Sequence, residues 1–284
     1  MPFTRESIRH PLAVRRAAVA AVRPLTPTMV RITLAGSELD GFVSAGPADH
    51  VKVFFPDPAT GVLTAPTVTA EGTQRPAEGT IISRDYTPLA FRAEGDGPEL
   101  DLDFVLHGDD GPASAWAARA EPGEQLAIAG PRGSRLVPPE MERLVIVADE
   151  TALPATARWL RLAPSSVPVT GILDVADESV EDYFETGCLD TGYLDAEQRG
   201  RASFEWLYRR DGLGQLDEAL RSLGPIDERT YVFLAGEATA LIPLRRYLRR
   251  QLGLPADQVS ASGYWKRGIV NLDHHTPLDP ADPD

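Results

Sequence analysis

The amino-acid pattern changes character near Pro138-Pro139, and this change constrains the fold more than any other feature of the sequence. Before it, short runs of alternating polar and apolar residues, such as 49–55 and 100–106, are separated by Gly and Pro turns. Such alternation is typical of half-buried antiparallel strands. After it, Leu144–Ala148 is continuously apolar, as in a parallel strand buried on both faces. The sequence therefore predicts two domains of different class.

The first half is expected to form an antiparallel β-barrel, because short strand-like runs recur between turns. Further strands are expected over 14–22, 29–34 and 125–129. One helix is expected over 112–120, between two strands. The Pro-, Gly- and Thr-rich stretch 57–79 is interpreted as a loop or a loosely paired insertion in the barrel.

The second half alternates strands with helices, which predicts an open parallel sheet of α/β type. The expected strands after 144–148 are 167–175, 203–208 and 231–235, and the expected helices are 152–162, 213–223 and 238–252. We therefore predict a β-barrel domain over 1–138 and an α/β domain over 139–262. A C-terminal segment over 263–284 is expected to end in a flexible tail rich in Asp and Pro.

Composition and charge restrict the class of partner. The chain has 28 basic and 42 acidic residues, a formal net charge of −14, which disfavours binding to nucleic acid. No stretch approaches the roughly 20 apolar residues of a membrane span. The first residues lack the apolar core of a secretory signal, and the single cysteine, Cys188, excludes an internal disulfide. We expect a cytoplasmic monomer without membrane insertion.

The segment Arg84-Asp85-Tyr86-Thr87-Pro88 is the first candidate site. On a strand, Arg84 and Tyr86 share one face, whereas Thr87 points the other way. Arg84 can bind a pyrophosphate through two parallel hydrogen bonds, and Tyr86 can stack on a planar ring. Taken alone, the segment is equally consistent with an ordinary strand that carries a surface Arg and a packed Tyr.

The segment from His107 to Trp116 is the second candidate, a strand that enters a Gly-rich turn and then a helix. The first turn of a helix presents unpaired N–H groups to anions, and Gly108 and Gly111 allow a phosphate to approach the backbone. Ser114 can add a hydroxyl group. The alternative is a plain strand-to-helix connection with an Asp or Ser cap, and His107 is interpreted as a structural residue rather than an acid or base.

Two more candidates lie where expected strands of the second half meet helices, at 148–155 and 235–240. Open parallel sheets bind nucleotides beyond the carboxyl ends of their strands. Neither segment carries a GxGxxG fingerprint, and Asp149 and Glu150 are equally consistent with solvated loop acids. The basic helix that follows 235–240 is likewise consistent with a solvated surface face.

The segment Gly263-Tyr264-Trp265-Lys266-Arg267-Gly268 is the last candidate. Its adjacent aromatic and cationic residues could line a pocket for an anionic aromatic ligand. The alternative is a C-terminal segment that two aromatic side chains pin to the core. His274 and His275 follow without further metal ligands, so they are assigned no function.

In this order and spacing, these segments resemble the siderophore-interacting protein family of FAD-dependent ferric-siderophore reductases. The resemblance runs from about Thr28 to Gly268 and rests on seven short motifs. The motifs are Arg84–Pro88, Asp103–Gly108, Gly111–Ser114 with Trp116, Gly130–Gly133, Asp149–Ala155, Ala235–Glu237 and Gly263–Gly268.

The resemblance implies a ferredoxin-NADP reductase-like architecture, in which a flavin-binding antiparallel β-barrel precedes a parallel-sheet NAD(P)H-binding α/β domain. It implies FAD as cofactor, NADPH or NADH as electron donor, and a ferric siderophore as substrate. No catalytic side chain and no protein-bound metal are implied. The residues implied for the cofactor are Arg84, Tyr86, Thr87, His107, Gly108, Ala113, Ser114 and Thr151, and those implied for the substrate are Lys52, Lys266 and Arg267.

The chain departs from the family pattern at Leu89, where members commonly carry an Arg, so one cationic contact is missing. This departure and the insertion over 57–79 leave the identity of the siderophore open. Two alternatives also stay open: another flavin reductase of the ferredoxin-reductase superfamily, and a siderophore-binding protein without turnover. The sequence does not distinguish NADH from NADPH, since Arg209, Arg210 or the arginines of 245–250 could each meet a 2′-phosphate.

Overall fold

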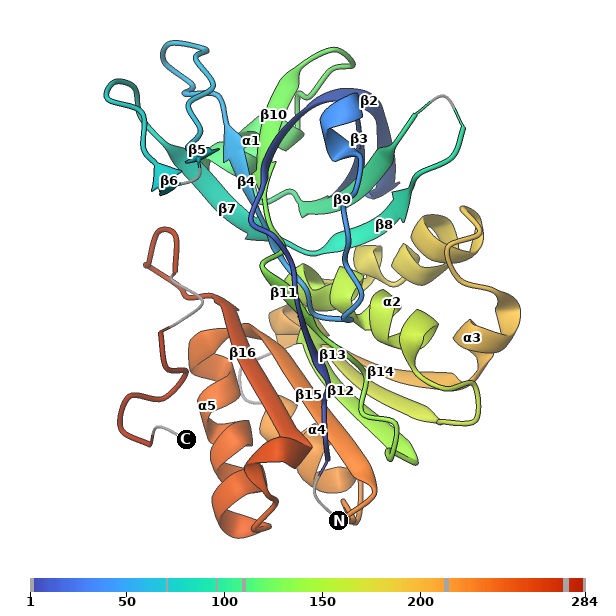
Figure 1. Cartoon of the computed structure of the whole chain (residues 1–284). Helices are drawn as coiled ribbons and strands as arrows, with labels where there is room; N and C mark the ends of the chain where they lie inside the picture. Colours follow the sequence, from blue (N-terminus) through green and yellow to red (C-terminus); the bar gives the residue numbers. More distant parts are fainter. Residues whose placement is uncertain are drawn as a thin grey trace. The chain divides into compact units, whose positions relative to one another are not determined.

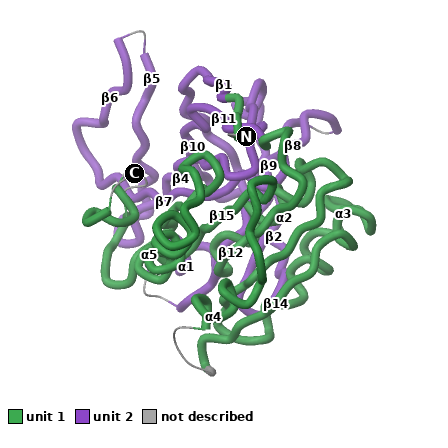
Figure 2. The backbone as a smooth tube through the Cα atoms, turned by 90° about the horizontal axis from the view of Figure 1, so that it is seen from below, with its two compact units in different colours: residues 1–6, 137–284 green, residues 7–136 purple. Residues whose placement is uncertain are grey.

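The computed structural model describes residues 3–69, 71–95, 97–108, 111–211, 215–272 and 276–282. It divides into two compact units, one of residues 7–136 and one of residues 1–6 together with 137–284 (Figure 2). The first is an all-β unit with one short helix, and the second is an α/β unit. The predicted sequence of a β domain followed by an α/β domain is therefore confirmed.

The β unit is built on a seven-stranded antiparallel sheet. Its strands, in order across the sheet, are β7 (Ile82–Tyr86), β4 (Val51–Phe55), β10 (Gln125–Ala129), β2 (Val14–Thr26), β3 (Met29–Ala35), β9 (Glu99–Val105) and β8 (Pro88–Arg92). The edge strands β7 and β8 are separated in the chain by Thr87 alone. The sheet must therefore curl into a barrel-like shape that brings its two edges towards each other at Thr87 (Figure 1).

Two pairs of short strands and one helix complete the β unit. The insertion over 57–79 contains the hairpin of β5 (Thr67–Thr69) and β6 (Gly72–Gln74), which agrees with the expected loose pairing. Strand β1 (Ser7–Arg9) pairs with β11 (Gly133–Arg135). Helix α1 (Pro112–Ala117) is shorter than the predicted helix over 112–120, and its Trp116 packs on Phe55 in the core.

The alternation along β9 explains how this sheet has two different faces. Leu100, Leu102 and Phe104 are fully buried in the apolar core. On the opposite face, Asp103 forms two hydrogen bonds with Arg31 on the adjacent β3, at 2.7 and 2.9 Å. The side chains of this pair are 0% and 4% exposed, respectively. The polar face of the strand is thus neutralised by buried ion pairing.

The α/β unit contains a five-stranded parallel sheet. Its strands, in spatial order, are β14 (Ala202–Tyr208), β13 (Val169–Val175), β12 (Arg143–Asp149), β15 (Thr230–Glu237) and β16 (Val259–Trp265). The chain starts at the central β12, adds strands on one side, and then crosses to the other side at β15. The space beyond the carboxyl ends of β12 and β15 is therefore a topological switch point, where such sheets bind ligands.

Helices cover both faces of this parallel sheet (Figure 1). The helices are α2 (Leu153–Leu162), α3 (Ala196–Gly200), α4 (Gln215–Ser222) and α5 (Ala238–Arg246), the last of which continues as a π-helical turn over Tyr247–Gln251. On one face, Trp159 of α2 packs against Tyr231 and Phe233 of β15. On the other, Val145 and Val147 form a core with residues of α4 and α5. Burial on both faces is why β12 is continuously apolar.

The structure differs from the prediction at one strand of this unit. Strand β16 was not predicted, and it includes Gly263, Tyr264 and Trp265 of the expected C-terminal segment. An edge strand with small polar residues lacks the apolar run that marks a buried strand. In the described part of the acidic tail, Asp279 is buried and pairs with Arg246, and the flexibility of the tail stays a prediction. Part of the predicted helix over 213–223 and residues 283–284 of the tail lie outside the described residues.

No helix in the described ranges has both the length and the apolar character needed to cross a bilayer.

The Arg31–Asp103 pair provides a test of the β unit. Replacing Asp103 by Asn removes the negative charge that faces the buried Arg31, so we expect a loss of about 3 kcal/mol in the free energy of unfolding. Equilibrium denaturation followed by circular dichroism measures this loss. The matched control is Glu142→Gln, which breaks an ion pair with Arg229 whose side chains are 62% and 61% exposed. That change is expected to cost far less, because solvent screens an exposed ion pair. Equal losses for both variants would contradict the importance assigned to burial of the Arg31–Asp103 pair.

Candidate functional site

Strand β7 presents Arg84 next to the closure of the curled sheet. It pairs with β4, so that Arg84 lies opposite Val53 and Tyr86 lies opposite Val51. The Arg84 guanidinium donates one hydrogen bond to the carbonyl oxygen of Ser83, at 2.7 Å, and forms no ion pair with any described residue. A half-buried guanidinium with unused donors is suited to an anionic group such as a pyrophosphate.

Tyr86 and Thr87 complete this motif at the end of β7. The Tyr86 ring packs on Phe104 with 4.2 Å between centroids and lies at 6.2 Å from Phe55. Burial raises the pKa of the Tyr86 hydroxyl above its usual range, so this residue stays neutral. Thr87 is buried between the two edge strands. The three predicted residues lie within four consecutive positions and are partly shielded from water, and their contacts to a flavin remain a prediction.

Lys52, a predicted substrate residue, is engaged by a neighbouring carboxylate. It lies opposite Asp85 across the β4–β7 ladder, and its Nζ is 2.7 Å from Asp85 Oδ1. Its side chain is only 36% exposed. Lys52 therefore has less capacity to attract an anion than a cation without a partner.

The turn between β9 and α1 is held together by Ser114. Its hydroxyl accepts a hydrogen bond from the backbone N–H of His107 and donates one to the carbonyl oxygen of Gly108, each at 3.0 Å. Ser114 is 2% exposed, and its hydroxyl already bonds to the backbone of the turn, which makes it less available for the predicted contact to a phosphate. The His107 side chain is exposed and lies beside Gly111, where an added Cβ would be 3.3 Å from the imidazole. Asp109 and Asp110 of this motif lie outside the described residues.

The first turn of α1 fits an anionic group. Its N-cap residue is Gly111, which provides no side-chain hydrogen bond to the helix, and Pro112 occupies the first position. Ala113 is buried, and Gly108 adopts a φ of 78°, which favours glycine. Backbone N–H groups at an uncapped helix start are donors for phosphate oxygens. Together with Arg84 on the contacting strand β7, this turn matches the chemistry of a dinucleotide pyrophosphate.

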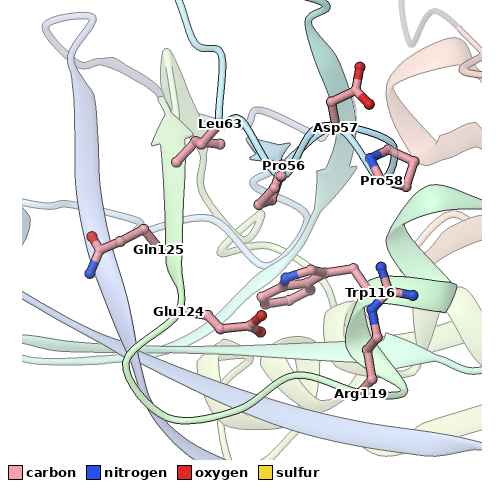
Figure 3. A pocket seen from close by; sticks show the side chains of 9 residues that line it. Pro56, Asp57, Pro58, Leu63, Trp116, Arg119, Glu124 and Gln125 are labelled. Atoms are coloured by element: carbon pink, nitrogen blue, oxygen red, sulfur yellow. The ribbon is translucent and has the colours of Figure 1, made fainter.

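A pocket of about 280 Å³ lies at another part of the β unit (Figure 3). Pro56, Leu63, Arg119 and Glu124 line it, and the Trp116 side chain extends from α1 towards it. The indole nitrogen of Trp116 is buried and has no hydrogen-bond partner among the described residues. The start of the insertion over 57–79 thus forms a wall of this pocket, whose lining does not include Arg84.

In the α/β unit, Asp149 stands at the switch point and organises Thr151. The Asp149 side chain is the cap of the short turn Glu150–Ala152. Its Oδ1 accepts hydrogen bonds from the Thr151 backbone N–H at 2.9 Å and from the Thr151 hydroxyl at 2.5 Å. The hydroxyl proton of Thr151 is therefore used internally, and its oxygen remains available only as an acceptor.

The acids around Thr151 are not the solvated loop residues that the sequence left open. Asp149 and Glu150 are 5% and 8% exposed. Glu150 forms two hydrogen bonds with Arg209, which also donates to the carbonyl oxygen of Asp174 at 2.6 Å. Burial, with a contribution from the charge of Glu150, raises the pKa of both Asp149 and Asp174 to about 6.

Lys266 and Arg267 lie in a turn directly after β16. A bridge pairs Lys266 with Ile269, and Gly268 has a φ of 78°. The backbone N–H of Arg267 donates to Glu237 Oε1 at 3.2 Å. Both cationic side chains are exposed and form no ion pair with the described residues. They therefore present free positive charge in an acidic protein.

The other arginines considered for a 2′-phosphate already have partners. Arg210 pairs with Glu178, and Arg209 is held by Glu150. The helical arginines pair with the C-terminal tail: Arg246 with Asp279, and Arg245 and Arg250 with Asp282. The alternative of a solvated basic face on this helix is thus wrong for Arg245, which is 3% exposed.

Sequence reasoning missed the network around Asp149. It identified Thr151, Lys266 and Arg267 as candidate site residues. It did not predict that Glu237 and Trp265 both donate hydrogen bonds to the Asp149 carboxylate. The available signal was the position of Asp149 directly after a continuously apolar strand, since that position lies at the carboxyl edge of the sheet.

Both halves of the chain match family models. Residues 18–135 match the siderophore-interacting FAD-binding domain, and residues 141–268 match the siderophore-interacting protein model.

Curated relatives and solved structures agree with these models. The chain is 34% identical to the NADPH-dependent ferric-chelate reductase of Escherichia coli, over 92% of this chain and 96% of that protein. It is 32% identical to the ferric vibriobactin reductase ViuB of Vibrio cholerae, over 88% of this chain and 89% of that protein. A siderophore utilization protein from T. fusca has a TM-score of 0.81 and 38% identity, covering 96% of this chain and 100% of that one. A ferredoxin reductase at 18% identity, with a TM-score of 0.60, shares the fold alone, and the predicted ferredoxin-reductase-like fold is thereby confirmed.

Asp174 provides a pH test of the switch-point electrostatics. Its folded pKa of about 6 lies above the unfolded value of about 4, so the native state holds the proton more tightly. The resulting stabilisation is complete below about pH 4 and is lost as the pH rises through 6. Asn carries no such proton. We therefore expect Asp174→Asn to gain about 2 kcal/mol relative to the natural protein between pH 4 and 7, measured by denaturant unfolding.

The control for this test is Asp177→Asn, on the exposed turn that follows β13. Hydrogen bonds from Ser179 lower the pKa of Asp177, so the sign is reversed. Its stabilising effect is present above the unfolded pKa and is lost as the pH falls. The same sign of pH dependence in both variants would contradict the assignment of burial as the cause at Asp174.

Proposed function

Because the chain belongs to the siderophore-interacting protein family, we propose that it reduces ferric siderophores, with FAD as its cofactor and NADPH as electron donor. The observation that carries this proposal is the match of both halves to the family models, over 18–135 and 141–268. The relative named as an NADPH-dependent ferric-chelate reductase supports both the activity and the donor.

The β unit offers groups that suit FAD. Arg84 and the first turn of α1 would bind the pyrophosphate, and Tyr86 and Thr87 would lie along the flavin. Support comes from the guanidinium of Arg84, which has no ion-pair partner among the described residues, and from the uncapped start of α1 at Gly111. His107, Gly108, Ala113 and Ser114 would line the phosphate and adenine side.

The chemistry divides between cofactor and protein. When bound, FAD would supply the electron transfer, because a flavin can take a hydride from NADPH and release its two electrons one at a time, enough for two ferric chelates. The protein would bind and orient the partners, and Thr151 would contribute a hydrogen-bond acceptor to cofactor binding. The iron is substrate: hard oxygen ligands hold iron(III) far better than iron(II), and one-electron reduction therefore loosens the chelate.

The substrate site would depend on local charge. Lys266 and Arg267 are exposed cations without ion-pair partners in the described part of the chain, whereas Lys52 is paired with Asp85. We therefore assign Lys266 and Arg267 the main role in attracting an anionic ferric chelate, and Lys52 a lesser one. The net charge of −14 makes this local patch necessary, because the overall field repels anions.

The proposal also places the protein in the cytoplasm as a monomer. NADPH is a cytoplasmic reductant, and the one cysteine of the sequence, Cys188, is buried and cannot form a disulfide within the chain. Size-exclusion chromatography with light scattering tests the oligomeric state, and a mass near twice 30.7 kDa would contradict it.

Arg84→Ala is expected to weaken FAD binding by about tenfold to a hundredfold, because charge-assisted hydrogen bonds to phosphate are lost. Arg84→Lys should be intermediate, since it keeps the charge but not the planar fork. Titration of the FAD-free protein with FAD, followed by flavin fluorescence, measures the effect. The control is Arg92→Ala on β8, whose guanidinium is occupied by Glu99 and Asp101. Equal losses in Arg84→Ala and Arg92→Ala would argue against the predicted pyrophosphate site.

The double variant Lys266→Ala/Arg267→Ala should raise KM for an anionic ferric chelate by roughly tenfold at low salt and reduce its dependence on ionic strength. The matched control is Arg143→Ala/Arg229→Ala, which removes the same charge at the opposite, amino edge of the parallel sheet. That control should leave KM nearly unchanged. A KM that does not depend on salt in the natural protein would exclude a cationic substrate site.

Anaerobic spectroscopy tests the activity itself. NADPH should bleach the flavin absorbance of the purified holoprotein near the ~450 nm typical of flavins, and ferric chelates should restore it with release of iron(II) to a chromogenic chelator. A protein that binds ferric chelates but shows no flavin would instead support a binding protein without turnover. A flavin that NADPH bleaches but no ferric chelate reoxidises would indicate another class of flavin reductase.

A further inference from the structure

The carboxyl edge of the parallel sheet contains a hydrogen-bonded chain that joins Thr151 to the Lys266–Arg267 turn. Its first link is Asp149, whose Oδ1 accepts both donors of Thr151. Its Oδ2 accepts the indole N–H of Trp265 at 2.7 Å and the backbone N–H of Glu237 at 2.9 Å. One buried side chain thus connects the ends of β12, β15 and β16.

The second link is Glu237, which carries the connection on to the turn. Its Oε2 accepts the backbone N–H of Ala240 at 2.7 Å, and its Oε1 accepts that of Arg267 at 3.2 Å. The turn is closed by the hydrogen bond from Ile269 N–H to the Lys266 carbonyl oxygen, at 3.0 Å. The backbone that bears both cations is therefore held from two sides, by Trp265 and by Glu237.

The backbone is shaped for this arrangement. Gly236 has a φ of 147°, and a Cβ placed there would lie 2.6 Å from Asp149 Oδ2, so only glycine admits the carboxylate. The β15–β16 ladder shifts register at this point, so that Gly236 pairs with Gly263 but Glu237 pairs with Trp265. Such a bulge re-aims the side chains that follow it.

The hydrogen bonds that the Asp149 carboxylate already accepts limit its chemical role. A carboxylate has about four acceptor sites, and Thr151, Glu237 and Trp265 supply four donors to them. No acceptor position remains for a substrate proton or for a ligand. Asp149 therefore suits the fixing of its neighbours rather than acid or base chemistry.

We propose that Asp149 is a positioning residue for the reductase reaction proposed above: its buried carboxylate holds the Lys266–Arg267 turn in fixed register with Thr151, so that both cations are presented together to an anionic ferric chelate. The proposal deepens the assigned function and rests on it for the identity of the chelate. In this proposal, Trp265 and Glu237 connect Asp149 to the turn through their hydrogen bonds.

The test variant is Asp149→Asn in the full-length holoprotein. Asn keeps one acceptor oxygen, so it cannot serve both pairs of donors: in either orientation its NH₂ group faces the donors of Thr151 or those of Trp265 and Glu237, and the link between them is weakened. Gallium(III) chelates serve as binding probes because gallium(III) is not reduced, one an anionic tris-catecholate and one a neutral trihydroxamate. The variant is expected to lower the ratio of anionic to neutral affinity by about tenfold. A loss of overall stability alone would not change this ratio.

A double-mutant cycle decides whether the effect acts through the cations. In the Lys266→Ala/Arg267→Ala background, Asp149→Asn should leave the ratio unchanged. If the tenfold change persisted in that background, Asp149 would act by another route and the proposal would be overturned. The matched control is Asp174→Asn, a half-buried acid near the end of the neighbouring strand β13 with no hydrogen bond or ion pair to the turn among the described residues, which should leave the ratio unchanged.

Hydrogen exchange gives a readout independent of activity. Amides of 263–269 should exchange faster in Asp149→Asn than in the natural protein, whereas those of 202–208 in β14 should not change. Unchanged exchange over 263–269 would overturn the positioning role, even if the chain is a reductase. Conversely, faster local exchange with no reduction of any ferric chelate would remove the proposed function but retain the role of Asp149 in the turn.

Trp265→Phe keeps the test decisive if Asp149→Asn does not fold. It removes only the indole donor and retains an aromatic ring, so the same local exchange and a smaller fall in the affinity ratio are expected. A normal ratio and normal exchange in this variant would contradict the inference.

Discussion

The buried carboxylate of Asp149 is the main constraint on the carboxyl edge of the parallel sheet in the α/β unit. A charged group can remain in such a place only when its oxygens are fully hydrogen-bonded. Here the donors come from the turn after β12, from the end of β15 and from β16. The need to satisfy this group therefore determines where three strands end and why Gly236 has no side chain.

A different constraint organises the β unit. The edge strands of its sheet are adjacent in the chain and separated only by Thr87, so covalent connectivity forces the sheet to curl. The same connection places Arg84 and Tyr86 at the closure, next to the aromatic core that α1 covers. The short connection at Thr87 thus accounts both for the curled shape of the sheet and for the position of the candidate cofactor residues.

Charge distribution bears on the proposed binding of an anionic chelate by an acidic protein. Most of its arginines near the candidate regions are neutralised in pairs, such as Arg209 with Glu150 and Arg246 with Asp279. Arg84 in one unit and the Lys266–Arg267 turn in the other have no ion-pair partner among the described residues. These cations are therefore available to the anionic groups of the proposed cofactor and substrate.

The sequence by itself determined the two classes of domain, because the period of its apolar residues is a local property that reports burial on one face or on both. It also identified the segments that carry Arg84, Ser114, Thr151 and Lys266, from the types of residue they contain and, for Ser114 and Thr151, from their positions after predicted strands. Only the tertiary structure decided the partners: that Lys52 is paired with Asp85, that Asp149 is buried rather than solvated, and that β16 joins the sheet as an edge. These are contacts between residues far apart in the chain, and local sequence patterns carry no information on which distant donor meets which acceptor.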